Sequence, residues 1–187
     1  MTESERVPIT ARDQITDQSA KRSMADARNP STPAPLDPRR DLPAPLVHGL
    51  QACLKGGMVI GQRSLDAVPA TGGAYALILR LEKEAAIDLP RFGPEPIAPG
   101  WYLYAGSAYG PGGLRARLAR HFRPAKKPHW HIDRLTSICA PAAALSVPGG
   151  NECAVVSELI ASGAFRFALT GFGATDCRQC KSHLLAW

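Results

Sequence analysis

The feature that most constrains the fold is a pair of short apolar segments with the composition of β-strands. Residues 74–81 follow a turn at Thr71, Gly72 and Gly73 and have the length of a buried or half-buried strand. Residues 101–105 are rich in aromatic side chains and end at Gly106. Glycine and proline dominate residues 93–100, which have the chemistry of a loop. We therefore expect the two segments to form a strand pair.

The first part of the chain has a different composition. Residues 1–45 are polar and proline-rich, with almost no aromatic or β-branched run. Such a segment cannot bury enough apolar surface to fold, so we predict a disordered tail over residues 1–45 and one folded domain over residues 46–187. Seven basic and seven acidic side chains leave the tail neutral, which argues against its use as a phosphate-binding arm.

Composition limits the class of protein. A length of 187 residues with 45% apolar content suits one domain with a core. No apolar run approaches the ~18 residues of a membrane span, and the first residues lack the pattern of a signal peptide, so we expect a cytoplasmic protein without a membrane partner. The net charge of +6 falls on the folded domain and favours a polyanionic partner, without proving nucleic acid.

Three segments after the second strand have helical patterns. In residues 114–122, Leu114 and Leu118 share one face, while Arg117 and His121 share another. A second helix is expected to begin near His129, and a third over residues 152–162 behind an Asn151 N-cap. The expected fold class is α/β (α+β), with a small, mainly antiparallel three-stranded sheet flanked by helices.

The segment from Tyr102 to Arg134 gathers tyrosines, histidines and seven basic side chains around one acidic residue, Asp133. Cleavage of a phosphodiester needs a base for the attacking water, a cation for the developing charge, and a metal or an acid for the leaving oxygen. This segment offers the first two groups. Glu152, at the start of the third helix, is available for the last.

Five sequence elements, in the right order, resemble the GIY-YIG endonucleases. The matching positions are Gly73-Ala74-Tyr75, Tyr104-Ala105-Gly106, Arg117, His121 and Glu152. Alanine replaces the usual branched residue in both tripeptides, and residues 90–100 lengthen the spacing between them. The motif at His129-Trp130-His131 and the C-terminal cysteines further resemble one branch, domain of unknown function 123, also called Uri-type.

The resemblance implies a metal-dependent endonuclease, a hydrolase acting on ester bonds, with DNA favoured over RNA and one Mg²⁺ or Mn²⁺ ion. It implies that Tyr75 is the general base or organises the water, with Tyr104 as its partner, while Arg117 holds phosphate and His121 assists. Tyr102 is expected to face the other side of the strand. Glu152 is the implied metal ligand. The implied substrate-binding residues are Ser107, Arg115, Arg120, Lys126, Lys127, His129 and His131.

Each of these residues also has a purely structural interpretation. Tyr75 could be core packing, Arg117 a solvated helix residue, and Glu152 a carboxylate that stabilises a helix N-terminus. The histidines at 129 and 131 could make structural hydrogen bonds. The sequence alone leaves these alternatives open.

The chain has five cysteines, and this odd number favours free thiols or metal ligands over a disulfide framework. Cys177, Cys180 and His183 are spaced like zinc ligands but supply only three of the four that a structural zinc site needs. Buried thiols are the favoured interpretation, with zinc and redox chemistry as alternatives.

Two functions from other classes also remain: a catalytically inactive nucleic-acid-binding module of the same fold, and a small zinc-binding interaction protein. The oligomeric state is not indicated.

Overall fold

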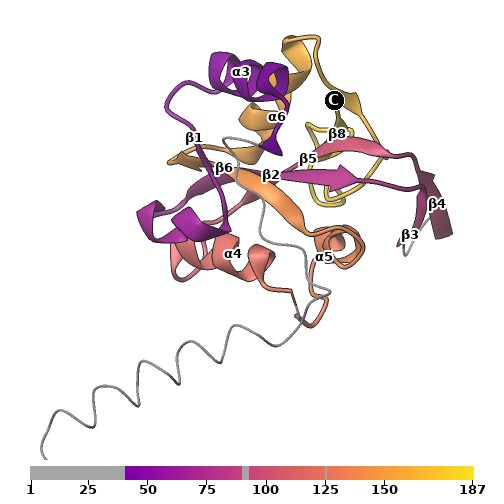
Figure 1. The fold of residues 1–187 in the computed structure, drawn as a ribbon, viewed down its shortest axis with the longest axis horizontal. Coiled ribbons are helices and arrows are strands. Elements are labelled where there is room, and N and C mark those ends of the chain that lie inside the picture. Colours follow the sequence, from indigo (N-terminus) through magenta and orange to yellow (C-terminus); the bar gives the residue numbers. More distant parts are fainter. Residues whose placement is uncertain (1–40, 90–92, 125) are drawn as a thin grey trace, which may run out of the picture. The chain divides into compact units, whose positions relative to one another are not determined.

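The structure is a computed structural model that describes residues 41–89, 93–124 and 126–187, which form an α+β fold (Figure 1). Most of the predicted tail lies outside the described residues. Packing begins slightly before the expected boundary at residue 46, because Leu42 is already buried and helix α3 begins at Ala44. The helical elements are α3 (Ala44–Cys53), the 3-10 helix η1 (Gln62–Ala67), α4 (Gly113–Phe122), α5 (His131–Thr136) and α6 (Glu152–Ala161).

The main sheet has six strands, so the expectation of three was wrong. The strands lie in the order β1-β6-β2-β5-β8-β7, and every pair is antiparallel. The missed strands are hard to recognise because they are very short or, in β6, rich in alanine, which has weak strand propensity. The strand bounds are β1 (Met58–Ile60), β2 (Gly73–Leu81), β5 (Gly100–Ser107), β6 (Pro141–Pro148), β7 (Arg166–Phe167) and β8 (Leu184–Ala186).

The predicted strand pair is confirmed, and its register fixes the positions of both tripeptides. Strand β2 lies between β5 and β6, with Tyr75 opposite Gly106 on β5. The predicted loop over residues 93–100 was wrong in part, because β3 (Ala85–Leu89) and β4 (Gly93–Ile97) form a separate hairpin. Two prolines, Pro94 and Pro96, are tolerated in β4 because only β3 pairs with it among the described strands.

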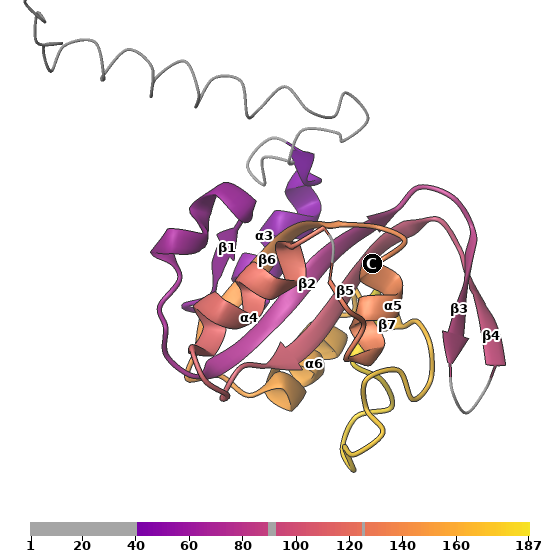
Figure 2. The same ribbon diagram turned by 90° about the horizontal axis from the view of Figure 1, so that it is seen from below.

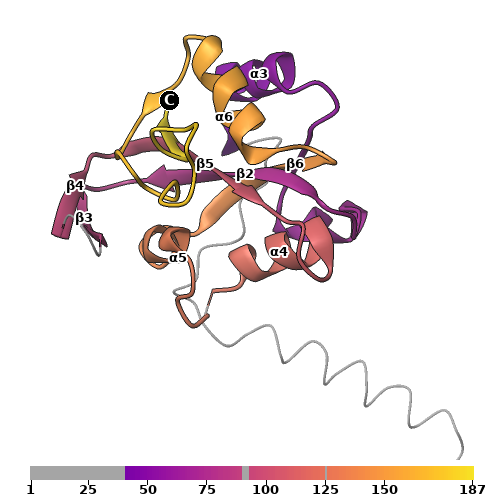
Figure 3. The same cartoon turned by 180° about the vertical axis from the view of Figure 1, so that it is seen from behind.

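Helices cover both faces of the main sheet. Helices α4 and α5 lie on one face, where their leucines and isoleucine pack with Tyr75, Leu77 and Leu79 (Figure 2). Helices α3 and α6 cover the opposite face, where Ala76 and Ile78 are buried (Figure 3). The alternation along β2 follows from the two-residue repeat of a strand.

The same repeat corrects the expectation for Tyr102. Residues two apart on a strand point to the same face, and Tyr102 and Tyr104 indeed belong to the same core cluster as Tyr75. The hydroxyl group of Tyr102 donates to the carbonyl of Ala98 at 2.6 Å, so this tyrosine supports the end of β5.

The predicted helices are confirmed, with one shift in position. The side chain of Asn151 caps α6 by accepting hydrogen bonds from the backbone N–H groups of Cys153 and Ala154, at 2.9 and 3.2 Å. Helix α5 begins at His131, two residues after the expected start. Among the described residues, the helices are too short or too polar to cross a membrane.

Replacing Leu77, which is fully buried in the central strand, with alanine should lower the free energy of unfolding by about 2–5 kcal/mol. The reason is the lost burial and the cavity left between the sheet and its helices. Met58→Ala is the matched control, because that side chain is 38% exposed on an edge strand and its loss should cost far less. Urea unfolding followed by circular dichroism measures both, and equal losses would contradict the assigned core.

Candidate active site

A pocket of about 800 Å³ forms where one end of strands β2 and β5 meets α4, the start of α6 and the loop before β8. Seven residues predicted from the sequence line it: Tyr75, Tyr104, Ser107, Arg117, His129, His131 and Glu152. They come from elements that are distant in the sequence. The fold therefore gathers most of the predicted site into one concave surface.

Tyr75 is a buried pocket residue, 3% exposed, and has a partner behind it. Its hydroxyl lies 2.8 Å from Nε2 of His121 on α4. Burial, with a further contribution from Tyr104, raises the pKa of Tyr75 well above its usual range. Burial and then Lys126 lower the pKa of His121 to about 3. At neutral pH the pair is therefore a phenol hydrogen-bonded to an uncharged imidazole.

Two glycines make room for Tyr75 and Tyr104. A Cβ on Gly106 would collide with the hydroxyl and ring of Tyr75 across the β2–β5 pair. A Cβ on Gly173, which has φ of +69°, would lie 2.6 Å from the ring of Tyr104. Tyr75, in the first tripeptide, can therefore take this position only because residue 106, in the second tripeptide, is glycine.

Tyr104 closes another part of the pocket wall. Burial raises its pKa to about 12, and the nearby carboxylates of Asp133 and Asp176 act in the same direction. Its ring makes an edge contact with Phe172, with the ring centres 5.9 Å apart. Tyr104 is therefore held as a protonated phenol whose hydroxyl can orient a water molecule or a phosphate oxygen.

Arg117 is positioned by an aromatic ring. Its guanidinium carbon lies 4.2 Å from the centre of the Trp130 ring, and that of Arg120 lies 4.1 Å from the same ring. Arg117 makes no ion pair with a carboxylate among the described residues, so its planar fork of donors faces the pocket unpaired. This geometry suits an anionic ligand, since a guanidinium binds phosphate through two parallel hydrogen bonds.

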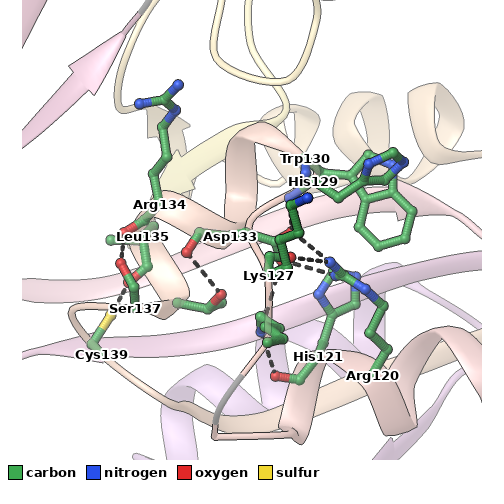
Figure 4. Close-up of polar contacts among 12 residues, drawn as sticks. Arg120, His121, Lys127, His129, Trp130, Asp133, Arg134, Leu135, Ser137 and Cys139 are labelled. Atoms are coloured by element: carbon green, nitrogen blue, oxygen red, sulfur yellow. Dashed lines mark hydrogen bonds and ion pairs between the residues drawn. The ribbon is translucent and has the colours of Figure 1, made fainter.

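Asp133 organises the loop that carries Trp130 (Figure 4). Its carboxylate is almost fully buried and accepts two hydrogen bonds from Arg120, at 3.0 and 2.9 Å. It also accepts from the backbone N–H groups of His129 and Trp130, at 2.8 and 3.0 Å. Burial opposes ionisation, but these hydrogen bonds hold the pKa of Asp133 well below its usual range. Asp133 thereby fixes Trp130, and Trp130 positions Arg117.

The other predicted basic residues lie outside this pocket. Arg115 donates from Nε to the carbonyl of Val68 at 2.7 Å, which gives it a structural role. Arg120, Lys126 and Lys127 line an adjacent hollow of about 530 Å³ that shares His129 with the pocket. Lys126 donates to the carbonyl of His121 at 2.9 Å, while Lys127 is exposed. His121 lies behind Tyr75 and does not line either hollow.

The structure adds a fourth member to the cysteine and histidine pattern. Cys153, on the first turn of α6, joins Cys177, Cys180 and His183, with ligand atoms that all lie within 4.8 Å of one another. Hydrogen bonds from the backbone N–H groups of Gln179 and Cys180 lower the pKa of Cys177 to about 6. The Cys₃His cluster could hold a metal ion.

A protein-family model described as "Domain of unknown function DUF123" matches residues 74–187. The chain belongs to this family. The predicted resemblance to the Uri-type branch of GIY-YIG-like proteins is therefore confirmed. The match begins at Ala74 and ends at residue 187, so it contains Tyr75, Tyr104, Arg117, Glu152 and the Cys₃His cluster. Neither a curated protein nor a solved structure matches the chain.

Several site residues of this DUF123 domain were not identified from its sequence. Trp130 and Asp133 lie beside the predicted histidines His129 and His131. The signal that could have identified Asp133 is that it is the one acidic residue in a basic segment. Asp176 lines the pocket from an irregular loop, and its place beside Cys177 in the C-terminal motif had not given it a role. Cys153 was missed because it lies 24 residues before Cys177.

The low pKa of His121 should make the stability of the DUF123 domain depend on pH. The unfolded chain, with a histidine pKa of about 6.5, binds more protons than the folded state between pH 6.5 and 3. The contribution of His121 to the free energy of unfolding is therefore complete above pH 6.5. It is lost as the pH falls, by up to about 1.4 kcal/mol per unit.

His121→Gln removes the titrating group and should flatten this dependence between pH 6.5 and 4.5, measured by urea unfolding at each pH. His129→Gln is the control, because that side chain is exposed, and the wild-type slope should persist. Identical slopes in the wild type and His121→Gln would contradict the burial of a neutral imidazole.

Proposed function

We propose that this DUF123 domain is a metal-dependent endonuclease that hydrolyses phosphodiester bonds in DNA. The observation that carries the proposal is the meeting of Tyr75, Tyr104, Arg117 and Glu152 in one pocket. These residues come from β2, β5, α4 and α6, and the sequence resemblance assigns each of them a position in the GIY-YIG pattern. A buried water-orienting group, an unpaired cation and a carboxylate around one cavity are the parts that phosphodiester hydrolysis requires.

Arg117 binds the scissile phosphate in this proposal. Trp130 holds the guanidinium at one orientation, and no carboxylate among the described residues competes for it. A preorganised donor of this kind stabilises the charge that develops on the phosphate oxygens in the transition state. Arg117 therefore contributes more to the rate of cleavage than to the affinity for the polymer.

Tyr75 and Tyr104 orient the attacking water from the floor of the pocket. Their raised pKa values mean that both are protonated at neutral pH, so neither is a base by itself. His121 accepts a hydrogen bond at Nε2 from the hydroxyl of Tyr75 when its proton is on Nδ1. Lowering the pKa of Tyr75 enough for proton transfer needs an added cation close to its hydroxyl.

The carboxylates of Glu152 and Asp176 fit a hard divalent cation. Both line the pocket, and neither forms an ion pair with a basic residue among those that the structure describes. Mg²⁺ binds through one or two carboxylates and keeps several waters, and Mn²⁺ accepts similar oxygen ligands. When bound, such an ion offsets the charge on the phosphate and stabilises the leaving oxygen. Glu152 and Asp176 would hold it, and the charges of both carboxylates already act on the pKa of Tyr104.

The adjacent hollow extends the positive surface beyond the scissile phosphate. Lys127 is exposed there, beside His129, Arg120 and Lys126. Arg120 and Lys126 are partly neutralised by Asp133, at 2.9 and 3.8 Å. We propose that this hollow contacts a flanking phosphate and contributes to binding rather than to chemistry.

One observation favours a second candidate, a nucleic-acid-binding module without catalytic activity. Burial raises the pKa of Tyr75 and Tyr104, so neither tyrosine supplies a phenolate base in the pocket at neutral pH. Arg117 and the basic hollow would still bind phosphates in such a module. The two candidates differ in whether a divalent cation activates the pocket.

Cleavage of labelled single- and double-stranded DNA and RNA, with Mg²⁺, Mn²⁺ or EDTA, tests the proposal. We expect nicking of DNA that depends on the metal. Glu152→Ala and Arg117→Ala should each lower the rate by about 10²–10³, because each removes a group that stabilises transition-state charge. Arg115→Ala is the matched control on the same helix and should stay within about threefold of the wild type, since Arg115 lies outside the pocket.

One result would overturn the role of Glu152, and another would overturn the nuclease function. An undiminished rate in a folded Glu152→Ala variant would remove the metal-binding role of that residue. Binding of DNA that weakens in Arg117→Ala, without cleavage of any substrate under any metal condition, would select the inactive binding module.

A further inference from the structure

The connection between β7 and β8, residues 168–183, contains no helix or strand, although it forms part of the pocket wall. Connections longer than about 12–15 residues without secondary structure are uncommon in compact domains. Phe172 anchors this one in the core, and a few backbone hydrogen bonds close its base, such as Gly171 to Lys181 at 2.8 Å. Its tip, which carries Asp176, Cys177 and Cys180, needs a further source of order.

The tip meets the first turn of α6 at the Cys₃His cluster. The sulfur atoms of Cys153 and Cys177 lie 3.5 Å apart, and all four ligand atoms lie within 4.8 Å of one another. Four ligands around a tetrahedral zinc ion, with zinc–sulfur distances of about 2.3 Å, place sulfur atoms about 3.8 Å apart. The spacing of the cluster therefore matches a closed tetrahedral site with only small adjustments.

Two further observations indicate that the cluster is built for a metal ion. Backbone N–H groups of Gln179 and Cys180 donate to the sulfur of Cys177, at 3.4 and 3.3 Å, which orients it and supports a thiolate. His183 is 5% exposed, and its Nε2 is buried without a hydrogen-bond partner among the described residues. A buried imidazole nitrogen without a partner is unusual unless a ligand satisfies it.

We propose that Cys153, Cys177, Cys180 and His183 bind one structural zinc ion that ties the loop before β8 to the start of α6. The set has no open position for a water, which is the arrangement of structural rather than catalytic zinc. The thiolates also separate this site from the carboxylates of Glu152 and Asp176, because hard cations such as Mg²⁺ prefer oxygen ligands.

The position of the zinc gives it a consequence for the pocket. Cys153 is adjacent to Glu152 in the sequence, and Cys177 is adjacent to Asp176. A zinc ion that joins the two cysteines fixes the backbone beside both carboxylates. The site would therefore hold one wall of the pocket in place whether the domain cleaves nucleic acid or only binds it.

Metal analysis of the purified full-length chain tests the proposal without reference to cleavage. We expect about one zinc per chain. Cobalt should replace it and give the visible absorption of a tetrahedral site with thiolate ligands. Cys153→Ser should lose most of the bound zinc, because a closed site then lacks a ligand. Cys139→Ser is the matched control, since this half-buried cysteine is outside the cluster, and its zinc content should equal that of the wild type.

Limited digestion with trypsin tests whether the zinc ion holds the loop before β8 against α6. It uses the wild-type chain, so the result does not depend on the folding of a variant. Arg178 and Lys181 are exposed sites within the loop, and Lys83 is an exposed site in the turn after β2. Removing zinc with a chelator should speed cleavage after Arg178 and Lys181 at least tenfold and leave cleavage after Lys83 unchanged. The melting temperature should fall by more than about 5 °C.

Three outcomes would overturn the proposal. The first is a wild-type chain that binds neither zinc nor cobalt. The second is a zinc content unaffected by Cys153→Ser, which would remove the fourth ligand. The third is unchanged cleavage after Arg178 and Lys181 on removal of the zinc, which would remove its role in holding the loop.

Discussion

The antiparallel register of β2 and β5 is the constraint on which the site depends. It sets Tyr75 opposite Gly106. Because that glycine has no side chain, the hydroxyl and ring of Tyr75 can occupy the space in front of it. Tyr104, two residues before Gly106, then points to the same face of the sheet. A shift of one residue in this pairing would turn one of the two tyrosines to the opposite face, against α3 and α6. The pocket floor is therefore a property of strand pairing.

The guanidinium groups of Arg117 and Arg120 are positioned by contacts that start from the buried carboxylate of Asp133. Asp133 binds Arg120 and the backbone N–H groups of His129 and Trp130, so the two residues just before α5 have a fixed position. Trp130 in turn lies against Arg117. This arrangement uses Arg120 for structure and leaves Arg117 unpaired, although both are helix arginines three residues apart. The division of roles follows from which guanidinium reaches the buried charge.

The acidic wall has a different construction, because irregular backbone carries part of it. Glu152 begins a capped helix, whereas Asp176 lies in a loop without helix or strand. A zinc ion at the Cys₃His cluster would join these two supports through the residues next to each carboxylate. In this arrangement, the zinc ion and its cysteine and histidine ligands make this side of the pocket rigid. The carboxylate oxygens of Glu152 and Asp176 remain available for a hard cation such as Mg²⁺.

The sequence by itself determined the local features of this protein: the paired strands, the helix carrying Arg117 and His121, the Asn151 cap, and the family. These depend on periodicity and on tripeptides whose residues lie close together in the chain. Tertiary structure alone decided the six-stranded sheet, the separation of Arg115 from the pocket, and the addition of Asp176 and Cys153. Each of those depends on contacts between segments far apart in the chain, where no local pattern records which side chains will meet.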